Sequence, residues 1–208
     1  MVNTELTEYI ETNILPNYNH FDKAHRMDHV QMVIDRSLQI AKHHPVDEDM
    51  VYTIAAYHDM GLIEDRKTHH LVSGRILRED KRLPDWFSPD EIETMARAVE
   101  DHRASSDHEP RSLYGKIVTE ADRFIDPVKI IERTIQFSLD HYPGFTEEDH
   151  WNRVVEHMHE KYAEGGYLKL WFPESPNTQR LEALRDIIRD ERKLRELFND
   201  IYSKLISH

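Results

Sequence analysis

Apolar residues recur at spacings of three and four along almost the whole chain, which is the periodicity of amphipathic α-helices. Segments that alternate apolar and polar residues do not stand out, and only six glycines interrupt the pattern. We therefore predict an all-α fold. The 208 residues suit one domain with a substantial core, and neither an internal repeat nor a low-complexity stretch divides them.

Caps and prolines set the expected helix boundaries. Asp47 is placed to cap one helix, and Ser88 begins another, because a proline and a glutamate follow it within the first turn. Asn177 is expected to cap one long, charged helix that reaches Leu205. The other clear helical segments are expected at about residues 4–15, 27–43, 68–79 and 128–139.

One apolar run ends in a histidine and an aspartate, His58 and Asp59. Val51, Ile54 and Ala55 precede His58 at helical spacings, so His58 continues a face that we expect to be buried. A carboxylate beside a histidine at the edge of a core is costly unless something pairs with it. A divalent metal ion would supply that pairing, since imidazole nitrogen and carboxylate oxygen are both good ligands.

Two further residues have the same character. His29 lies near the start of its expected helix, on the flank of an apolar stripe, and Asp122 lies one turn beyond Val118 at the edge of another. With His58 and Asp59 they come from three helices and lie on or beside the expected buried faces. Each alone has an ordinary explanation: a core histidine bonded to a carbonyl for His29, and an ion pair or a cap for Asp122.

This order, a histidine, a His-Asp doublet and a distant aspartate, resembles the HD-domain metal-dependent phosphohydrolase superfamily. The local sequence resembles that family in three places: its first-histidine segment, its doublet and its last motif. The matching segments are Ala24-His25-Arg26-Met27-Asp28-His29-Val30, His58-Asp59-Met60-Gly61 and Thr119-Glu120-Ala121-Asp122-Arg123-Phe124.

The resemblance covers about residues 20–130 and implies an HD-type helical domain in which His29, His58, Asp59 and Asp122 hold metal between helices. The expected organisation is a single domain over 1–208, with an HD core at about 20–130 and a C-terminal helical extension that supports it at about 131–208. The implied reaction is hydrolysis of a phosphate ester or anhydride of a small molecule, with nucleotides among the candidates. Two alternatives stay open: a di-iron oxygenase on the same scaffold, and a module that binds a ligand without turnover.

The implied cofactor is one or two divalent ions, of Mn, Mg, Fe, Ni or Zn, because a mixed shell of histidine and carboxylate discriminates poorly among them. Two-metal members of the superfamily have extra histidines before the last aspartate, so His70 and His102 are candidate ligands of a second ion. Either could instead bind phosphate or donate a proton, and His102 could be an ordinary core histidine. We interpret His69 as a solvated first-turn residue. His25 is either a partner of the site or a loop histidine.

The catalytic candidates are Asp59, His102 and Glu64. Glu64 and its neighbour Asp65 follow the doublet closely enough to reach a bound water as a general base, although a solvated acidic loop explains them equally well. Four cations flank the motifs and are candidates for binding substrate phosphate, with solvent exposure as the alternative: Arg66, Lys67, Arg103 and Arg123.

Composition limits the partners. The formal charge of −13 argues against binding a nucleic acid polymer, yet a metal can reverse the local field for a small phosphorylated substrate. The absence of cysteine excludes thiolate metal sites and disulfides. No apolar run reaches membrane-spanning length and no signal peptide is evident, so we expect a soluble, cytoplasmic protein with no membrane partner. A homodimer is an open alternative to a monomer.

Overall fold

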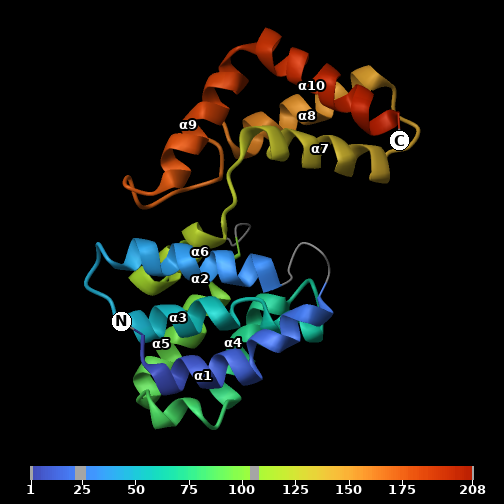
Figure 1. The fold of residues 1–208 in the computed structure, drawn as a ribbon. Helices are drawn as coiled ribbons and strands as arrows, with labels where there is room; N and C mark the ends of the chain where they lie inside the picture. Colours follow the sequence, from blue (N-terminus) through green and yellow to red (C-terminus); the bar gives the residue numbers. More distant parts are fainter. Residues whose placement is uncertain (1, 22–26, 104–107, 208) are drawn as a thin grey trace. The chain divides into compact units, whose positions relative to one another are not determined.

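The structure is a computed structural model that describes residues 2–21, 27–103 and 108–207 (Figure 1). These ranges contain ten α-helices and three short 3-10 segments but no strand, which confirms the all-α prediction. The helices are α1 Thr4–Asn13, α2 Met27–Ala41, α3 Glu48–Tyr57, α4 His69–Glu79, α5 Pro89–Glu100, α6 Leu113–Asp122, α7 Pro127–His141, α8 Glu147–Lys161, α9 Pro176–Arg189 and α10 Glu191–Ile206. The 3-10 segments are η1 Leu15–His20, η2 Met60–Ile63 and η3 Leu83–Asp85.

The helices fall into two compact units. The first, Met1–Arg123, contains α1 to α6, and the second, Phe124–His208, contains α7 to α10. The expected single domain, with an HD core at about 20–130, stays a prediction. Among the described residues, no helix combines the length and the apolar character that a membrane-spanning segment requires.

Helix α3 is the centre of the first unit. Every residue from Met50 to Tyr57 is buried, because α3 packs against α2, α5 and α6 (Figure 1). A helix that is covered on several sides needs apolar residues around its whole circumference, which explains the continuous apolar run in the sequence. The chain that leaves the C-terminus of α3 therefore emerges inside the unit.

Two of the three expected caps are present, and the third is wrong: α9 begins at Pro176 and is capped by Ser175, whose hydroxyl accepts the N–H of Asn177 at 3.2 Å. The Asp47 carboxylate accepts the backbone N–H of Asp49 at 2.7 Å, and α3 begins directly after it. At α5 the Ser88 hydroxyl accepts the N–H of Glu91 at 3.4 Å, while the Glu91 carboxylate accepts the N–H of Ser88 at 2.8 Å. This reciprocal capping box satisfies two of the backbone donors that a helix start leaves unpaired.

Two expected helix ends are wrong. The long helix over 177–205 is interrupted at Asp190, whose backbone leaves the helical region with φ −99° and ψ 88°. The Asp190 side chain accepts the N–H of Lys193 at 3.1 Å, so this residue caps a new helix, α10. The helix that we expected to carry the His-Asp doublet ends at Tyr57, and His58 and Asp59 follow it.

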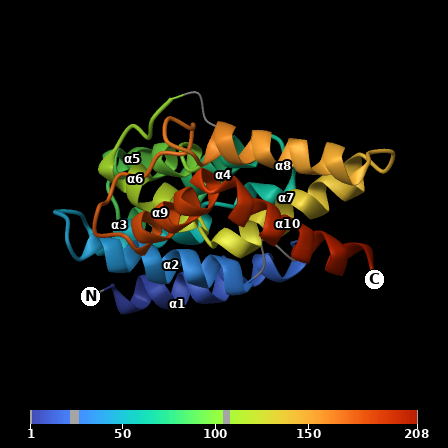
Figure 2. The same ribbon diagram turned by 90° about the horizontal axis from the view of Figure 1, so that it is seen from above.

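The second unit has its own core. Helices α7 and α8 are joined by the turn at 142–146 and pack against each other, while α9 and α10 pack on α7 (Figure 2). Each helix contributes an apolar stripe to this core. Its fully buried members are Ile131, Ile135, Val154, Met158, Leu184 and Phe198.

Gly61 provides a test of the close packing beside the doublet. A Cβ at this position would lie 2.8 Å from the backbone nitrogen of Ser73 and 2.8 Å from the carbonyl carbon of His69, so η2 and α4 would have to separate. We expect Gly61→Ala to lower the free energy of unfolding by about 1–3 kcal/mol in urea denaturation. Gly144→Ala is the matched control, because no atom lies within 4 Å of its added methyl. Equal stability of the two variants would contradict this packing.

Candidate metal centre

Asp59 lies just beyond the C-terminus of α3, among four histidines. Its side chain is 4% exposed, and its two oxygens face different histidine pairs. Oδ2 is 3.2 Å from Nε2 of His58 and 3.7 Å from Nε2 of His29. Oδ1 is 3.4 Å from Nε2 of His69 and 3.5 Å from Nε2 of His102. One carboxylate therefore belongs to two groups of ligand atoms.

Three of these histidines are oriented by the same local bond. Nδ1 of His58 lies 2.7 Å from the carbonyl oxygen three residues earlier, and His69 and His102 repeat this contact at 2.8 Å and 2.6 Å. A carbonyl oxygen can only accept, so Nδ1 carries the proton and Nε2 presents its lone pair. This backbone contact is the usual way in which a metal-binding histidine is held in one tautomer.

His29 and Asp122 complete the first group. His29 is in the first turn of α2 and Asp122 is the last residue of α6, and both helices pack on α3. Oδ1 of Asp122 is 3.2 Å from Nε2 of His29 and 3.9 Å from Nε2 of His58. The four residues expected from the sequence to hold metal therefore converge from three parts of the chain.

The distances between imidazole nitrogens fit a site for cations. Nε2 of His58 is 3.3 Å from Nε2 of His29, and Nε2 of His69 is 3.2 Å from Nε2 of His102. Nitrogen lone pairs that face each other so closely repel unless a proton or a cation lies between them. With Asp59 added, the ligand atoms of each group lie within 4.8 Å of one another, as shared coordination of one ion requires.

The electrostatics of the centre favour positive charge. Burial disfavours the charged form of His58, yet the carboxylates of Asp59 and Asp122 outweigh burial and raise its pKa to about 9. Burial opposes ionisation of Asp59 too, but His58 and His102 hold the pKa of this carboxyl well below its ordinary value. Asp59 is therefore ionised at neutral pH and attracts either a proton or a metal ion.

Comparison with known proteins agrees with this arrangement. The model of the HD domain family matches residues 26–125, a range that includes all six residues of the centre. Residues 26–125 of the chain form an HD domain. The resemblance noted from the motifs is thereby confirmed; HD domains bind divalent metals, and the two groups of histidine and aspartate described above could hold such ions.

Two solved structures share the HD fold of this chain over nearly its whole length. A protein from Lactobacillus plantarum is 16% identical with a TM-score of 0.58, covering 92% of this chain and 97% of its own. Bacillus subtilis YpgQ in complex with ADP is 16% identical with a TM-score of 0.56, covering 91% and 94%. A predicted HD superfamily hydrolase from an uncultured Thermotogales bacterium is 21% identical with a TM-score of 0.47, covering 73% and 82%. Among curated proteins, none matches the sequence significantly.

The interpretation of His69 as a solvated residue is wrong. His69, which we interpreted as solvated, is only 15% exposed and faces Asp59. His70, which with His102 was a candidate ligand of a second ion, is in neither ligand group of the described residues. Burial, with the nearby charges of His102 and His69, lowers the pKa of His70 to about 4. Neighbouring residues on a helix point about 100° apart, so one of the pair faces the centre and the other does not.

Tyr18 supports the centre and was not singled out in the sequence. It is fully buried, and its hydroxyl donates to the carbonyl of Ala56 at 2.9 Å while accepting the N–H of Asp59 at 3.3 Å. This residue therefore fixes the backbone on both sides of His58. Tyr18 lies in the short 3-10 segment η1, where no helical period of the sequence identifies a buried position.

The remaining candidates surround the centre at different depths. Glu64 is 52% exposed and pairs with Arg75. Arg66 and Lys67 are exposed, and Lys67 offers its carbonyl oxygen to Nη1 of Arg103 at 2.8 Å. Arg103 directly follows His102 in the chain, and its charge, after burial and the charge of His102, contributes to lowering the pKa of His69.

Two candidates remain. Burial lowers the pKa of Arg123, the residue after Asp122, to about 10. His25 lies outside the described residues.

Asp59→Ala tests the shared carboxylate. Because Asp59 belongs to both groups of ligand atoms, we expect this variant to lose all metal on purification while its circular dichroism stays helical. Metal content by mass spectrometry is the measurement. His43→Ala, a change of an exposed histidine outside both groups, is the control and is expected to keep the full complement. Metal bound to Asp59→Ala as tightly as to the parent would disprove the assignment.

Proposed function

We propose that this HD domain is a metal-dependent phosphohydrolase that cleaves a phosphate ester or anhydride of a small molecule at a centre for two divalent ions. One observation carries the proposal: the two oxygens of Asp59 face two separate pairs of histidines. When bound, such ions activate a water molecule and offset negative charge on the phosphoryl group. A two-ion centre suits phosphate transfer to water because it can act on both the attacking and the leaving oxygen.

Each protein residue has a role in this proposal. His29, His58 and Asp122 hold the first ion, His69 and His102 hold the second, and Asp59 is shared. The bonds from Nδ1 to backbone carbonyls keep three of the rings directed at the centre before any ion binds. This preorganisation lowers the cost of assembling the site around each substrate.

Arg103 is the proposed first contact for substrate phosphate. Arg103 is exposed and directly follows His102 in the chain. Arg66 and Lys67 are also exposed and lie in the segment just before α4. A planar guanidinium binds phosphate oxygens through two parallel hydrogen bonds. The YpgQ crystal structure contains ADP, so nucleoside diphosphates belong in the substrate panel.

A di-iron oxygenase is the second candidate, because the same histidines and a bridging carboxylate also suit iron. Two iron ions per chain with oxygen consumption, and no phosphate release from any substrate, would favour it. A purely ligand-binding role is disfavoured, since a site without turnover has no need to keep all six converging donors.

A phosphate-release screen tests the proposed reaction. Purified protein with added Mn²⁺ is expected to release phosphate from at least one member of a panel of nucleotides and other small phosphate esters. His102→Ala is expected to reduce kcat on that substrate about a hundredfold, because it removes one ligand of the second ion. Circular dichroism of the variant should match the parent. An unchanged rate would return His102 to an ordinary core role.

Arg103→Ala separates binding from chemistry. Loss of a charged hydrogen bond to phosphate is expected to raise KM about tenfold with little change in kcat. Arg97→Ala is the matched control, because Arg97 is 54% exposed and its side chain pairs only with Glu93 among the ion pairs of the described residues. Equal KM values for the two variants would remove Arg103 from the substrate site.

A further inference from the structure

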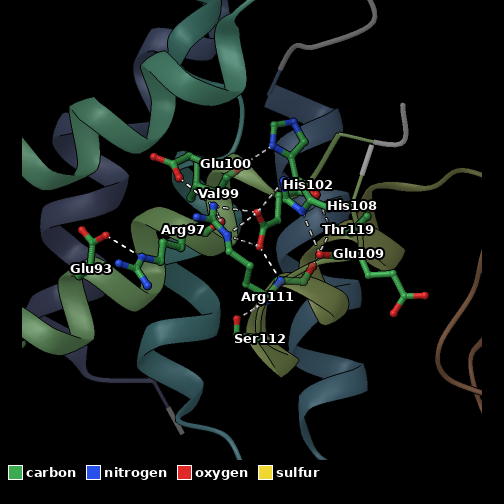
Figure 3. A network of polar contacts seen from close by, with 12 residues as sticks. Glu93, Arg97, Val99, Glu100, His102, His108, Glu109, Arg111, Ser112 and Thr119 are labelled. Carbon is green, nitrogen blue, oxygen red and sulfur yellow. Dashed lines mark hydrogen bonds and ion pairs between the residues drawn. The ribbon is translucent and has the colours of Figure 1, made fainter. Parts of the chain in front are cut away.

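A network of ion pairs surrounds Arg111, in the segment before α6 (Figure 3). Its Nε lies 2.9 Å from Oδ1 of Asp101, and its backbone N–H donates to Oδ2 of the same carboxylate at 2.7 Å. Its Nη2 donates to Oε2 of Glu100 at 2.8 Å and to the carbonyl of Arg97 at 3.1 Å. Arg111 therefore binds side chains and backbone at the C-terminal end of α5.

The network continues into α4. Nη1 of Arg78 lies 2.5 Å from Oε1 of Glu100, so the two oxygens of Glu100 bind an arginine of α4 and Arg111. Helices α4 and α5 are also in close contact here, since a Cβ on Gly74 would lie 2.7 Å from Cγ of Glu100. The chain of pairs Arg78–Glu100–Arg111–Asp101 thus joins α4 to the end of α5.

These are the two elements that carry the second ligand group. His69 is the first residue of α4, and His102 follows Asp101 directly after α5. The network contains no member of the first group, whose ligands come from α2, α6 and the end of α3. The ion pairs therefore join the same two helices, α4 and α5, that position the second pair of histidines.

Asp101 links Arg111 to His102, the next residue in the chain. Its side chain is 1% exposed, and the Arg111 guanidinium is its near ion-pair partner at 2.8 Å, with Nε2 of His108 farther away at 4.0 Å. A buried carboxylate that loses its partner is strongly destabilised and moves toward water. Such a movement would displace the adjacent His102 and its 2.6 Å contact from Nδ1 to the carbonyl oxygen of Val99.

We propose that Arg111 is a positioning residue that holds His102, and with it His69, in place for the second ion. This proposal rests on the proposed two-ion function, because that function assigns His102 and His69 to the second ion. The orientation of His102 can nevertheless be measured in protein without metal. Arg111 itself contacts neither group of ligand atoms among the described residues.

The first measurement is nitrogen NMR of the imidazole rings in metal-free protein, with His102 assigned through His102→Ala. We expect Arg111→Gln to shift or broaden the ring signals of His102 and His69 while those of His58 stay unchanged. Arg111→Lys is expected to restore them only partly, because an ammonium cannot bind Asp101 and Glu100 with a fixed fork. Arg82→Gln, which removes an exposed pair with Asp85 outside this network, is the control and should change none of them.

The second measurement is Mn²⁺ titration of the full chain, followed by electron paramagnetic resonance. The parent is expected to bind two ions with the spectrum of a coupled pair. Arg111→Gln is expected to bind the first ion within about twofold of the parent and the second at least tenfold more weakly, without the coupled spectrum. Two ions of parental affinity with an unchanged His102 signal would overturn the proposal.

Other outcomes separate the two proposals. A parent that binds one ion, with His102 signals that move only in the Arg111 variants, would support the positioning role and defeat the two-ion function. Loss of the first ion together with loss of helicity in Arg111→Gln would show general support of the fold and would overturn the positioning role.

Discussion

The first unit depends on keeping an ionised carboxylate inside a helical core. Asp59 is almost completely buried, and no nearby arginine or lysine pairs with it among the described ion pairs. Four histidine rings surround it instead, and a neutral ring compensates a buried charge only weakly. The arrangement is stable only when protons or metal ions supply positive charge, so the chemistry of the centre and the stability of its surroundings are linked.

Helix α3 explains how so many polar groups reach one point. Because it is covered on several sides, the residues that follow it begin inside the unit rather than at the surface. The packing of α2 and α6 on α3 then brings His29 and Asp122 to the same end, and the approach of α4 at Gly61 brings His69. Hydrogen bonds from Nδ1 to backbone carbonyls then fix the orientation of three of the rings. The helix contacts that form the fold therefore also set the geometry of the ligands.

The sequence predicted most of the helices, because helical period and capping are local properties, while the metal-binding role of the first ligand group stays a prediction. His29, His58, Asp59 and Asp122 were recoverable since each lies at the edge of an apolar stripe. The sequence could not show which of His69 and His70 faces the centre, because that depends on the rotation of α4 about its axis. The rotation is determined by the contact of α4 with Gly61 and by the contacts of Gly74 with Glu100 and Ala96. The sequence also did not show the break at Asp190, because an aspartate is common within a charged helix and only its backbone angles reveal that the helix ends there.

The two ligand groups are supported by different forces. The first is held by packed helices and by buried Tyr18, interactions that salt does not weaken. The second lies between α4 and α5, which pack on each other and are also joined by ion pairs in which Arg78 and Arg111 are 32% and 43% exposed; such pairs weaken as ionic strength rises. Both groups lie in the core of the unit, and the second has a salt-sensitive contribution to its support in addition to helix packing.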